Sequence, residues 1–181
     1  DVRRGLGGQR RGQSVRRRLV ALASVATALM AASAPSQGPD FSYLSADDPN
    51  VAAATAEAQT TLPIFWRLKD ESPAGYGAFA VKVGLPTVEH DAREHIWVNE
   101  LHRDGDVVTG KLANIPVDLG DLTVGSKVTF RSDMISDWQY TKNGLLYGHF
   151  ITRAVMKGFS AREQVELADI LAPEPLEAGV Q

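Results

Sequence analysis

The sequence contains no cysteine. This absence excludes disulfide bonds, thiolate metal sites, iron–sulfur clusters and thiol nucleophiles, and it also excludes a lipid-modified cysteine after a leader. Because cysteine usage is the usual indicator of redox compartment, the location of the protein has to be inferred from other features.

Positive charge is scarce beyond residue 18. Of the 19 Lys and Arg and 22 Asp and Glu in the chain, the first eighteen residues hold seven arginines and one aspartate, so the remainder has a net charge near −9. A nucleic-acid-binding domain needs a basic surface that faces the phosphates. The sequence therefore predicts no nucleic-acid partner.

The chain also lacks an apolar run long enough for a membrane span. Residues 19–34 carry no charge, but they are fewer than the roughly 20 mostly large apolar residues that a spanning helix needs. The run follows three arginines and ends in Ala32-Ser33-Ala34. This pattern predicts a signal peptide over residues 1–36, and thus a periplasmic or secreted protein without membrane contact after cleavage. The alternative interpretation is an uncleaved membrane anchor.

Two details of export stay open. Pro35 disfavours cleavage directly after Ala34, so the cut falls a few residues to either side. The arginine run is compatible with both the Sec and the twin-arginine route. Residues 37–47 are predicted to be a linker because they have no apolar period.

A helix is predicted over residues 48–71. Asp48 can cap it, and Pro49 suits the first helical position because its missing N–H is not needed there. Pro63 predicts a kink or the start of a second short helix. The apolar residues recur at spacings of three and four, and they form one face that packs on a core: Val51, Ala54, Ala58, Leu62, Phe65 and Trp66.

Between residues 76 and 155 the apolar pattern alternates, which predicts strands. We expect them to begin near residue 76 and to cover 94–102, 107–113, 127–132, 135–141 and 145–155, with turns at Gly105 and at Asn143-Gly144. In the strand 94–102, Ile96 and Val98 are expected on one face. The opposite face is expected to hold His95, Trp97, Asn99 and Leu101.

A closing helix over residues 160–171 follows from the capping box that Ser160 and Glu163 can form. Residues 173–181 are predicted to be a loose tail. The fold class is α+β: a small, strongly bent antiparallel sheet or an SH3-like barrel, with an N-terminal helix and a short C-terminal helix, over residues 48–172.

Five segments occur in an order that indicates a family. They are residues 94–98 (EHIWV), 110–116 (GKLANIP), 125–128 (GSKV), 135–138 (ISDW), and Tyr147-Gly148 with Thr152-Arg153. In this respect the chain resembles the YegJ-like bacterial family, domain of unknown function 2314 (DUF2314), over about residues 48–155. The resemblance implies a compact β domain, in some members behind a signal sequence, and it implies no reaction.

Six residues are candidates for a ligand site: His95, Trp97, Asn114, Asp137, Trp138 and Arg153. His95 cannot chelate an ion together with Glu94, since neighbours in a strand point to opposite faces, so we predict no metal site and no cofactor. Asp137 beside Trp138 could be a desolvated general acid or base. The favoured interpretation is structural: Asp137 bonds backbone N–H groups at the start of a strand, and Trp138 fills the core.

The other candidates are also weighed against structural roles. Asn114 is expected to close a turn. Arg153 could clamp an anion, although a salt bridge to Asp137 or Glu94 is favoured. Ser132, Ser136 and Ser160 lack a defensible His and Asp partnership, which leaves serine hydrolysis a remote option.

Three functions remain open from the sequence. The preferred hypothesis is a non-enzymatic binding or protein-interaction module for an unknown protein or small ligand, with Trp97 and Trp138 as aromatic anchors. A hydrolase built on His95, Asp137 and Arg153 is the alternative, and it requires the three side chains to converge in one cleft. A purely structural envelope protein is the third, and it is favoured if no pocket larger than a few waters exists.

Overall fold

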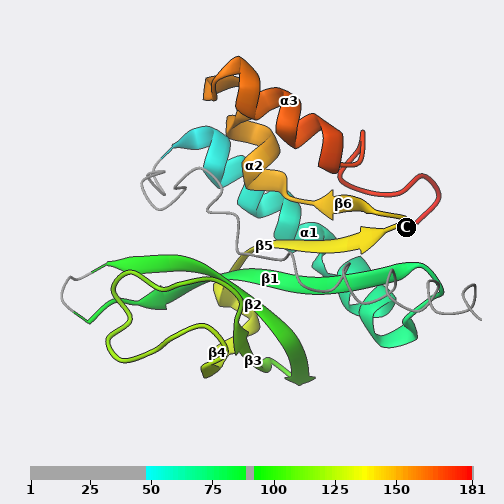
Figure 1. Ribbon diagram of the computed structural model, residues 1–181. Coiled ribbons are helices and arrows are strands. Elements are labelled where there is room, and N and C mark those ends of the chain that lie inside the picture. Colours follow the sequence, from blue (N-terminus) through cyan, green and yellow to red (C-terminus); the bar gives the residue numbers. More distant parts are fainter. Residues whose placement is uncertain (1–47, 89–91, 181) are drawn as a thin grey trace, which may run out of the picture. The chain divides into compact units, whose positions relative to one another are not determined.

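A computed structural model describes residues 48–88 and 92–180 of the protein (Figure 1). The predicted signal peptide (1–36) and linker (37–47) lie outside these residues. Within the described ranges no helix combines the length and apolarity needed to cross a membrane.

The first element is a single long helix, α1 (Pro49–Glu71). Its start is as predicted, because the Asp48 carboxylate accepts a hydrogen bond from Asn50 N at 2.8 Å and Pro49 occupies the first turn. The helix continues through Pro63, so no second helix begins there. All six residues of the predicted apolar face are buried.

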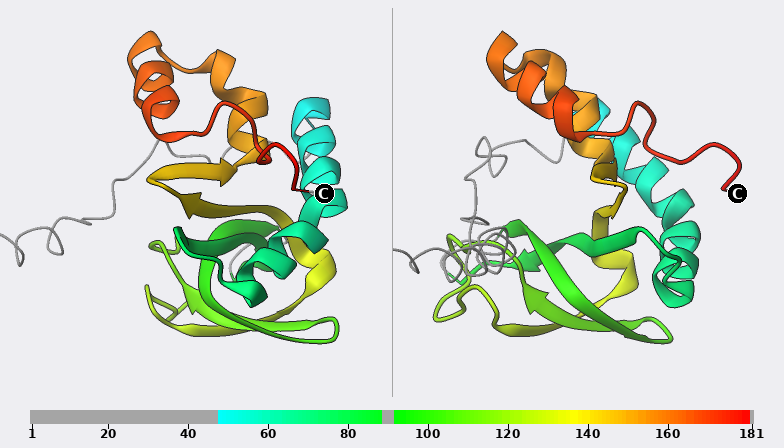
Figure 2. Two further views of the ribbon diagram at one scale, coloured as in Figure 1. Left: turned by 90° about the vertical axis from the view of Figure 1, so that its right-hand side faces the viewer. Right: turned by 45° about the vertical axis from the view of Figure 1, so that its right-hand side comes forward.

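Six antiparallel strands form one sheet in the order β4-β3-β2-β1-β5-β6. They are β1 (Tyr76–Pro86), β2 (Arg93–Asp104), β3 (Val107–Leu112), β4 (Lys127–Arg131), β5 (Ile135–Lys142) and β6 (Leu145–Gly148). The sheet bends strongly but does not close, since β4 and β6 remain at its two edges (Figure 2). The bent open sheet is therefore the correct alternative, and the closed barrel is not.

A β-bulge in β2 corrects one predicted side-chain direction. Asn99 pairs with Lys111 but His102 pairs with Thr109, so β2 has one extra residue between these pairs. Glu100 occupies this position with a left-handed φ of 48°. The alternation shifts by one residue, and Leu101 turns into the core instead of joining His95 and Trp97.

The predicted last strand, residues 145–155, is wrong in its second half. Strand β6 ends at Gly148, and residues Phe150–Val155 form the short helix α2. Gly148 and His149 both have positive φ, 78° and 56°, which turns the chain out of the sheet. The amide groups that begin α2 donate to Asp137 of β5, a contact that no local sequence pattern reveals.

The last helix, α3 (Ala161–Ile170), begins with the predicted capping box between Ser160 and Glu163. Its apolar side chains do not enter the core, and Val165 is 62% exposed. The segment behind α3 is not loose, because Leu171 and Ala172 are buried and Pro175 O accepts a hydrogen bond from Gly148 N.

The core lies between α1 and the concave interior of the sheet. Aromatic rings dominate its centre. The ring centres of Phe65 of α1 and Trp138 of β5 lie 5.6 Å apart, and the Trp138 ring stacks on that of Tyr140 with 5.8 Å between centres. The Trp138 indole Nε1 donates to the Ala58 carbonyl at 2.9 Å, which fixes α1 against β5.

Candidate functional site

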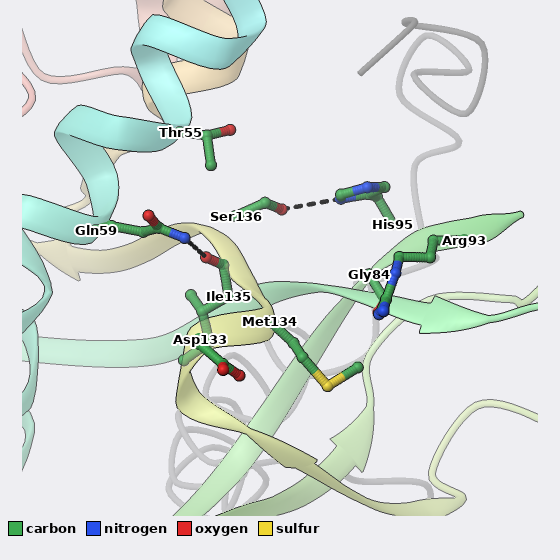
Figure 3. Close-up of a pocket in the computed structure, with 9 residues that line it drawn as sticks. All are labelled: Thr55, Gln59, Gly84, Arg93, His95, Asp133, Met134, Ile135 and Ser136. Carbon is green, nitrogen blue, oxygen red and sulfur yellow. Dashed lines mark hydrogen bonds between the residues drawn. The ribbon is translucent and has the colours of Figure 1, made fainter. Parts of the chain in front are cut away.

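An open hollow of about 380 Å³ lies where α1 faces the ends of β1, β2 and β5. Nine residues line it, and Figure 3 shows their polar groups around the space: Thr55, Gln59, Gly84, Arg93, His95, Asp133, Met134, Ile135 and Ser136. This volume exceeds a few waters at about 30 Å³ each. The observation that would favour a purely structural envelope protein, the absence of any pocket larger than a few waters, is therefore not made.

His95 is the one predicted site residue in this hollow, and it is paired with Ser136. The His95 Nδ1 lies 3.0 Å from Ser136 Oγ, and Ser136 Oγ lies 3.3 Å from the Lys82 carbonyl oxygen. Ser136 has one hydroxyl proton, so it donates to that carbonyl in the tautomer of His95 that is protonated at Nδ1, and to Nδ1 in the other. The sequence analysis missed this serine–histidine pair, since the bulge between Lys82 and Val83 in the β1–β5 pairing turns Ser136 toward β2.

The charge around His95 is positive. Loss of solvation lowers the pKa of His95, and the charges of Lys82 and Arg93 lower it further. Asp133, the acid of the hollow, is 3.3 Å from the Arg131 guanidinium, which compensates its charge. The hollow is thus electrostatically suited to a negatively charged group.

Asp137 lies outside the hollow and is almost completely buried, with 1% of its surface exposed. Its Oδ1 accepts from Trp138 N at 2.8 Å and from Phe150 N at 3.1 Å, and its Oδ2 accepts from Ile151 N at 3.0 Å. Burial raises the pKa of Asp137 to about 6, although these hydrogen bonds and Lys82 act in the opposite direction. The carboxylate bonds backbone N–H groups, as favoured from the sequence, but two of these groups begin helix α2 and not a strand.

His149, next to α2, is a second buried titratable group, and like Asp137 its pKa is shifted toward the neutral form. Burial lowers the pKa of His149 to about 4, and the charges of Arg153 and Lys82 contribute. Its Nδ1 lies 3.3 Å from Thr152 Oγ1, while its buried Nε2 has no hydrogen-bond partner among the described residues. The sequence analysis did not single out this histidine, because only the turn at Gly148 brings it inside.

The two groups act on stability with opposite signs. The contribution of His149 is complete above its unfolded pKa of 6.5 and is lost as the pH falls toward 4, because the unfolded state binds the proton more readily. The contribution of Asp137 is present below its unfolded pKa of 3.8 and is lost as the pH rises toward 6. Over the acidic range the two contributions nearly cancel in the native protein.

We expect His149→Asn to remove the contribution of His149 to the pH dependence of stability and to leave that of Asp137. Asparagine tolerates the left-handed backbone at position 149, so the fold is retained. Relative to the native protein, the variant should gain about 3 kcal/mol in free energy of unfolding between pH 7 and pH 4, because the unfolded chain no longer has an imidazole at position 149 that binds a proton over this range. Urea unfolding at pH 7, 5.5 and 4 measures this gain, and an equal difference at all three pH values would contradict it.

Trp97 and Asn114 lie together beside the core. The Asn114 side-chain oxygen accepts from Trp97 N at 2.9 Å and so ties the β3–β4 loop to β2. The partly exposed Trp97 ring lies 5.1 Å from the His149 ring and 5.9 Å from Lys82 Nζ. Trp138, by contrast, has no exposed surface, so it cannot serve as a binding anchor.

Arg153 lies outside the first hollow and next to the C-terminal segment. Its guanidinium donates to the carbonyl oxygens of Gly148 and Ala172 at 2.8 Å and of Leu146 at 3.4 Å. It lines a second hollow of about 570 Å³ between α1, α2 and the residues after α3. The salt bridge expected to Asp137 or Glu94 is not among the ion pairs of the described residues. Arg153 instead holds the C-terminal segment on β6.

The three residues of the hydrolase hypothesis therefore do not converge. His95 lines the first hollow, Arg153 lines the second, and Asp137 is buried and bonded to backbone N–H groups. Among the residues of the described ranges, no group of three His, Cys, Asp or Glu side chains has the arrangement of a metal site. The geometry gives no basis for a hydrolase that uses these three side chains.

A second surface was not foreseen from the sequence. Three aliphatic side chains project into solvent from the β1–β2 and β3–β4 loops, and we call them the aliphatic ridge: Val88, Ile115 and Val117, which are 69%, 54% and 79% exposed. The two loops lie at the same end of the sheet (Figure 1) and are joined by a 3.1 Å hydrogen bond from Val88 N to Asp118 O.

Glu94 holds the ridge in place from β2. Its two carboxylate oxygens accept from Val117 N and Asp118 N, each at 2.8 Å, and the buried Leu119 anchors the same loop in the core. The ridge could have been found from the sequence in one way. Residues 113–126 contain aliphatic residues without the alternating period of a strand, which indicates apolar side chains on a loop.

Comparisons with known proteins place these features in a family context. The profile of DUF2314, described as an uncharacterized protein conserved in bacteria, matches residues 48–170. A putative ankyrin repeat protein of Neisseria meningitidis serogroup B is 28% identical over 130 residues, which cover 68% of this chain and 51% of that protein. The uncharacterized protein YegJ of Escherichia coli K12 is 27% identical over 89 residues, 49% of this chain and 57% of YegJ. The chain spans about half the length of these relatives, and no solved structure matches it.

Proposed function

The chain belongs to DUF2314, a family of uncharacterized proteins conserved in bacteria, and on this premise we propose that it is an exported, non-enzymatic module that binds a protein partner through the aliphatic ridge. The single observation that carries the proposal is the strong exposure of Val88, Ile115 and Val117 on two joined loops. Single exposed aliphatic residues are common, whereas a group of them on one surface is typical of an interaction site.

The rigidity of the ridge supports the same function. Glu94 fixes the backbone of Val117 and Asp118, and Val88 N is bonded to the same loop. A preorganised loop loses little conformational entropy when a partner binds, so more of the contact energy remains for affinity. Exposed apolar side chains on such a loop contribute little to folding, which supports a role in binding.

The charge around the ridge indicates the character of the partner. Residues 113–126 include Asp118 and Asp121 but no lysine or arginine. A surface that is apolar at its centre and acidic at its rim complements an apolar segment flanked by basic residues. The predicted leader supports a partner in the periplasm or outside the cell.

Photo-crosslinking in the producing bacterium tests the function and the location together. With a benzoylphenylalanine at position 88 or 117, we expect one common crosslinked adduct in the periplasmic or secreted fraction, formed by a chain that has lost its leader. The matched control is position 165, which is 62% exposed on α3 and should not give that adduct.

Each readout can fail separately. The same adducts at positions 117 and 165, or none at 88 and 117, would refute binding through the ridge. An intact leader and a cytoplasmic adduct would refute export while leaving the ridge as a binding surface.

A further inference from the structure

The first hollow has the chemistry of a ligand site that is independent of the aliphatic ridge. Its lining residues come from α1, β1, β2, β5 and the short 3-10 helix Ser132–Met134, so distant parts of the chain meet there. Figure 3 shows the side chains of Gln59, Arg93, His95 and Ser136 around the open space. The question is which ligand these particular groups complement.

Arg93 supplies the charge. A guanidinium carries five N–H donors, and Arg93 directs one nitrogen, Nη1, to the Gly84 carbonyl at 2.9 Å. This bond orients the group at the wall of the hollow, and the remaining donors match a carboxylate well. Asp133 does not neutralise Arg93 through an ion pair, because its carboxylate faces Arg131.

His95 supplies an acceptor next to this charge. In the tautomer whose Nδ1–H donates to Ser136, with the serine proton on the Lys82 carbonyl, Nε2 bears a lone pair. Loss of solvation lowers the pKa of His95, the charges of Lys82 and Arg93 lower it further, and both effects favour the neutral ring. In that tautomer His95 Nε2 accepts a hydrogen bond from a ligand N–H or O–H.

Gly84 brings the two groups together. A Cβ at position 84 would lie 3.3 Å from His95 Nε2 and 3.4 Å from Arg93 Cδ, so both side chains cover the same glycine. The Arg93 side chain and the His95 ring thus lie side by side at Gly84, where the guanidinium is bonded to the Gly84 carbonyl. A carboxylate with an adjacent N–H, as at the C-terminus of a peptide, satisfies both at once.

We propose that this hollow binds the C-terminal end of a peptide, with Arg93 on the carboxylate and His95 Nε2 on the last amide N–H. The observation that carries the proposal is the placement of the Arg93 and His95 side chains together over Gly84, and the proposal assigns to His95 the tautomer with a lone pair on Nε2. A free small carboxylate shares part of this chemistry, and the experiment has to separate the two sources.

The test is an NMR titration of the full chain with three probes: N-acetyl-dialanine, its C-terminal amide, and acetate. We expect saturable shifts of the backbone amides of Gly84, His95 and Ser136 with N-acetyl-dialanine. The affinity of each of the other two probes should be at least about tenfold lower, because each lacks one of the two recognised groups. Acetate that binds as tightly as the peptide would refute the role of His95, and an equally tight amide would refute that of Arg93.

Two pairs of variants locate the site. Arg93→Gln should weaken peptide binding by about tenfold or more, while Arg162→Gln, a change at an exposed arginine of α3 outside the hollow, should not. Gly84→Ala should displace the two side chains and weaken binding, while Gly77→Ala in the same strand, where a Cβ meets only Thr141 Oγ1 at 3.6 Å, should retain it. Equal affinities within either pair, or no saturable shift with the peptide, would overturn the proposal.

Discussion

Replacing Trp138 by alanine is expected to lower the free energy of unfolding by about 3–5 kcal/mol, as for other large aromatic residues removed from a core. The ring has no exposed surface, and it contacts Phe65 at 5.6 Å, Tyr140 at 5.8 Å and Phe150 at 5.1 Å between ring centres. Its loss leaves a cavity at the point where α1, α2 and β5 meet. It also leaves the Ala58 carbonyl without the indole N–H that it accepts.

Trp97→Ala is the matched control for this prediction. Trp97 is the same residue type in the same sheet, but it is partly exposed and packs mainly against His149 and Lys82. Its removal should cost about 1–2 kcal/mol, because less apolar surface returns to water. Denaturant unfolding of both variants gives the comparison. A loss below about 1 kcal/mol for Trp138→Ala would show that the ring does not support the core.

Gly148→Ala should be similarly damaging, for a different reason. Gly148 joins β6 to α2 with a φ of 78°, and an added Cβ would lie 2.0 Å from the Trp138 carbonyl oxygen and 2.7 Å from its ring. The left-handed backbone costs an L-residue about 1–2 kcal/mol, and overpacking against a core adds about 1–3 kcal/mol. We expect a total loss of roughly 2–5 kcal/mol in the free energy of unfolding.

Gly144→Ala separates these two causes. Gly144 has a φ of 84°, but no atom lies within 4 Å of its added Cβ. This variant should show the backbone cost alone, about 1–2 kcal/mol. Thermal or urea unfolding of the two variants measures the difference. Equal losses at positions 144 and 148 would mean that the close approach of Gly148 to Trp138 has no energetic consequence.

Local patterns in the sequence were sufficient for much of the fold. The Asp48 cap, the Ser160 capping box and the apolar face of α1 depend on residues a few positions apart, and all three occur as predicted. The ordered motifs between residues 94 and 153 also predicted the family correctly. These features have a short range, so one sequence contains the information for them.

The candidate site could be predicted only in part. His95 lines the first hollow, but its partner Ser136 is 41 positions away and was set aside for lack of a histidine. Trp138 was proposed as a ligand anchor and is fully buried instead. Periodicity gives the face of a strand on which a side chain lies, and it does not show which face another element covers.

The sequence by itself determined the family, the starts of α1 and α3, most of the alternating strands and the acidic character of residues 19–181. Only the tertiary structure decided that the sheet stays open, that the chain leaves it after Gly148, and that Arg93 and His95 meet over Gly84. The physical reason is one of range. Caps and periods arise between near neighbours, whereas Asp137 begins α2 from another strand, and Ser136 reaches His95 through a bulge that forms only when β1 and β5 pair.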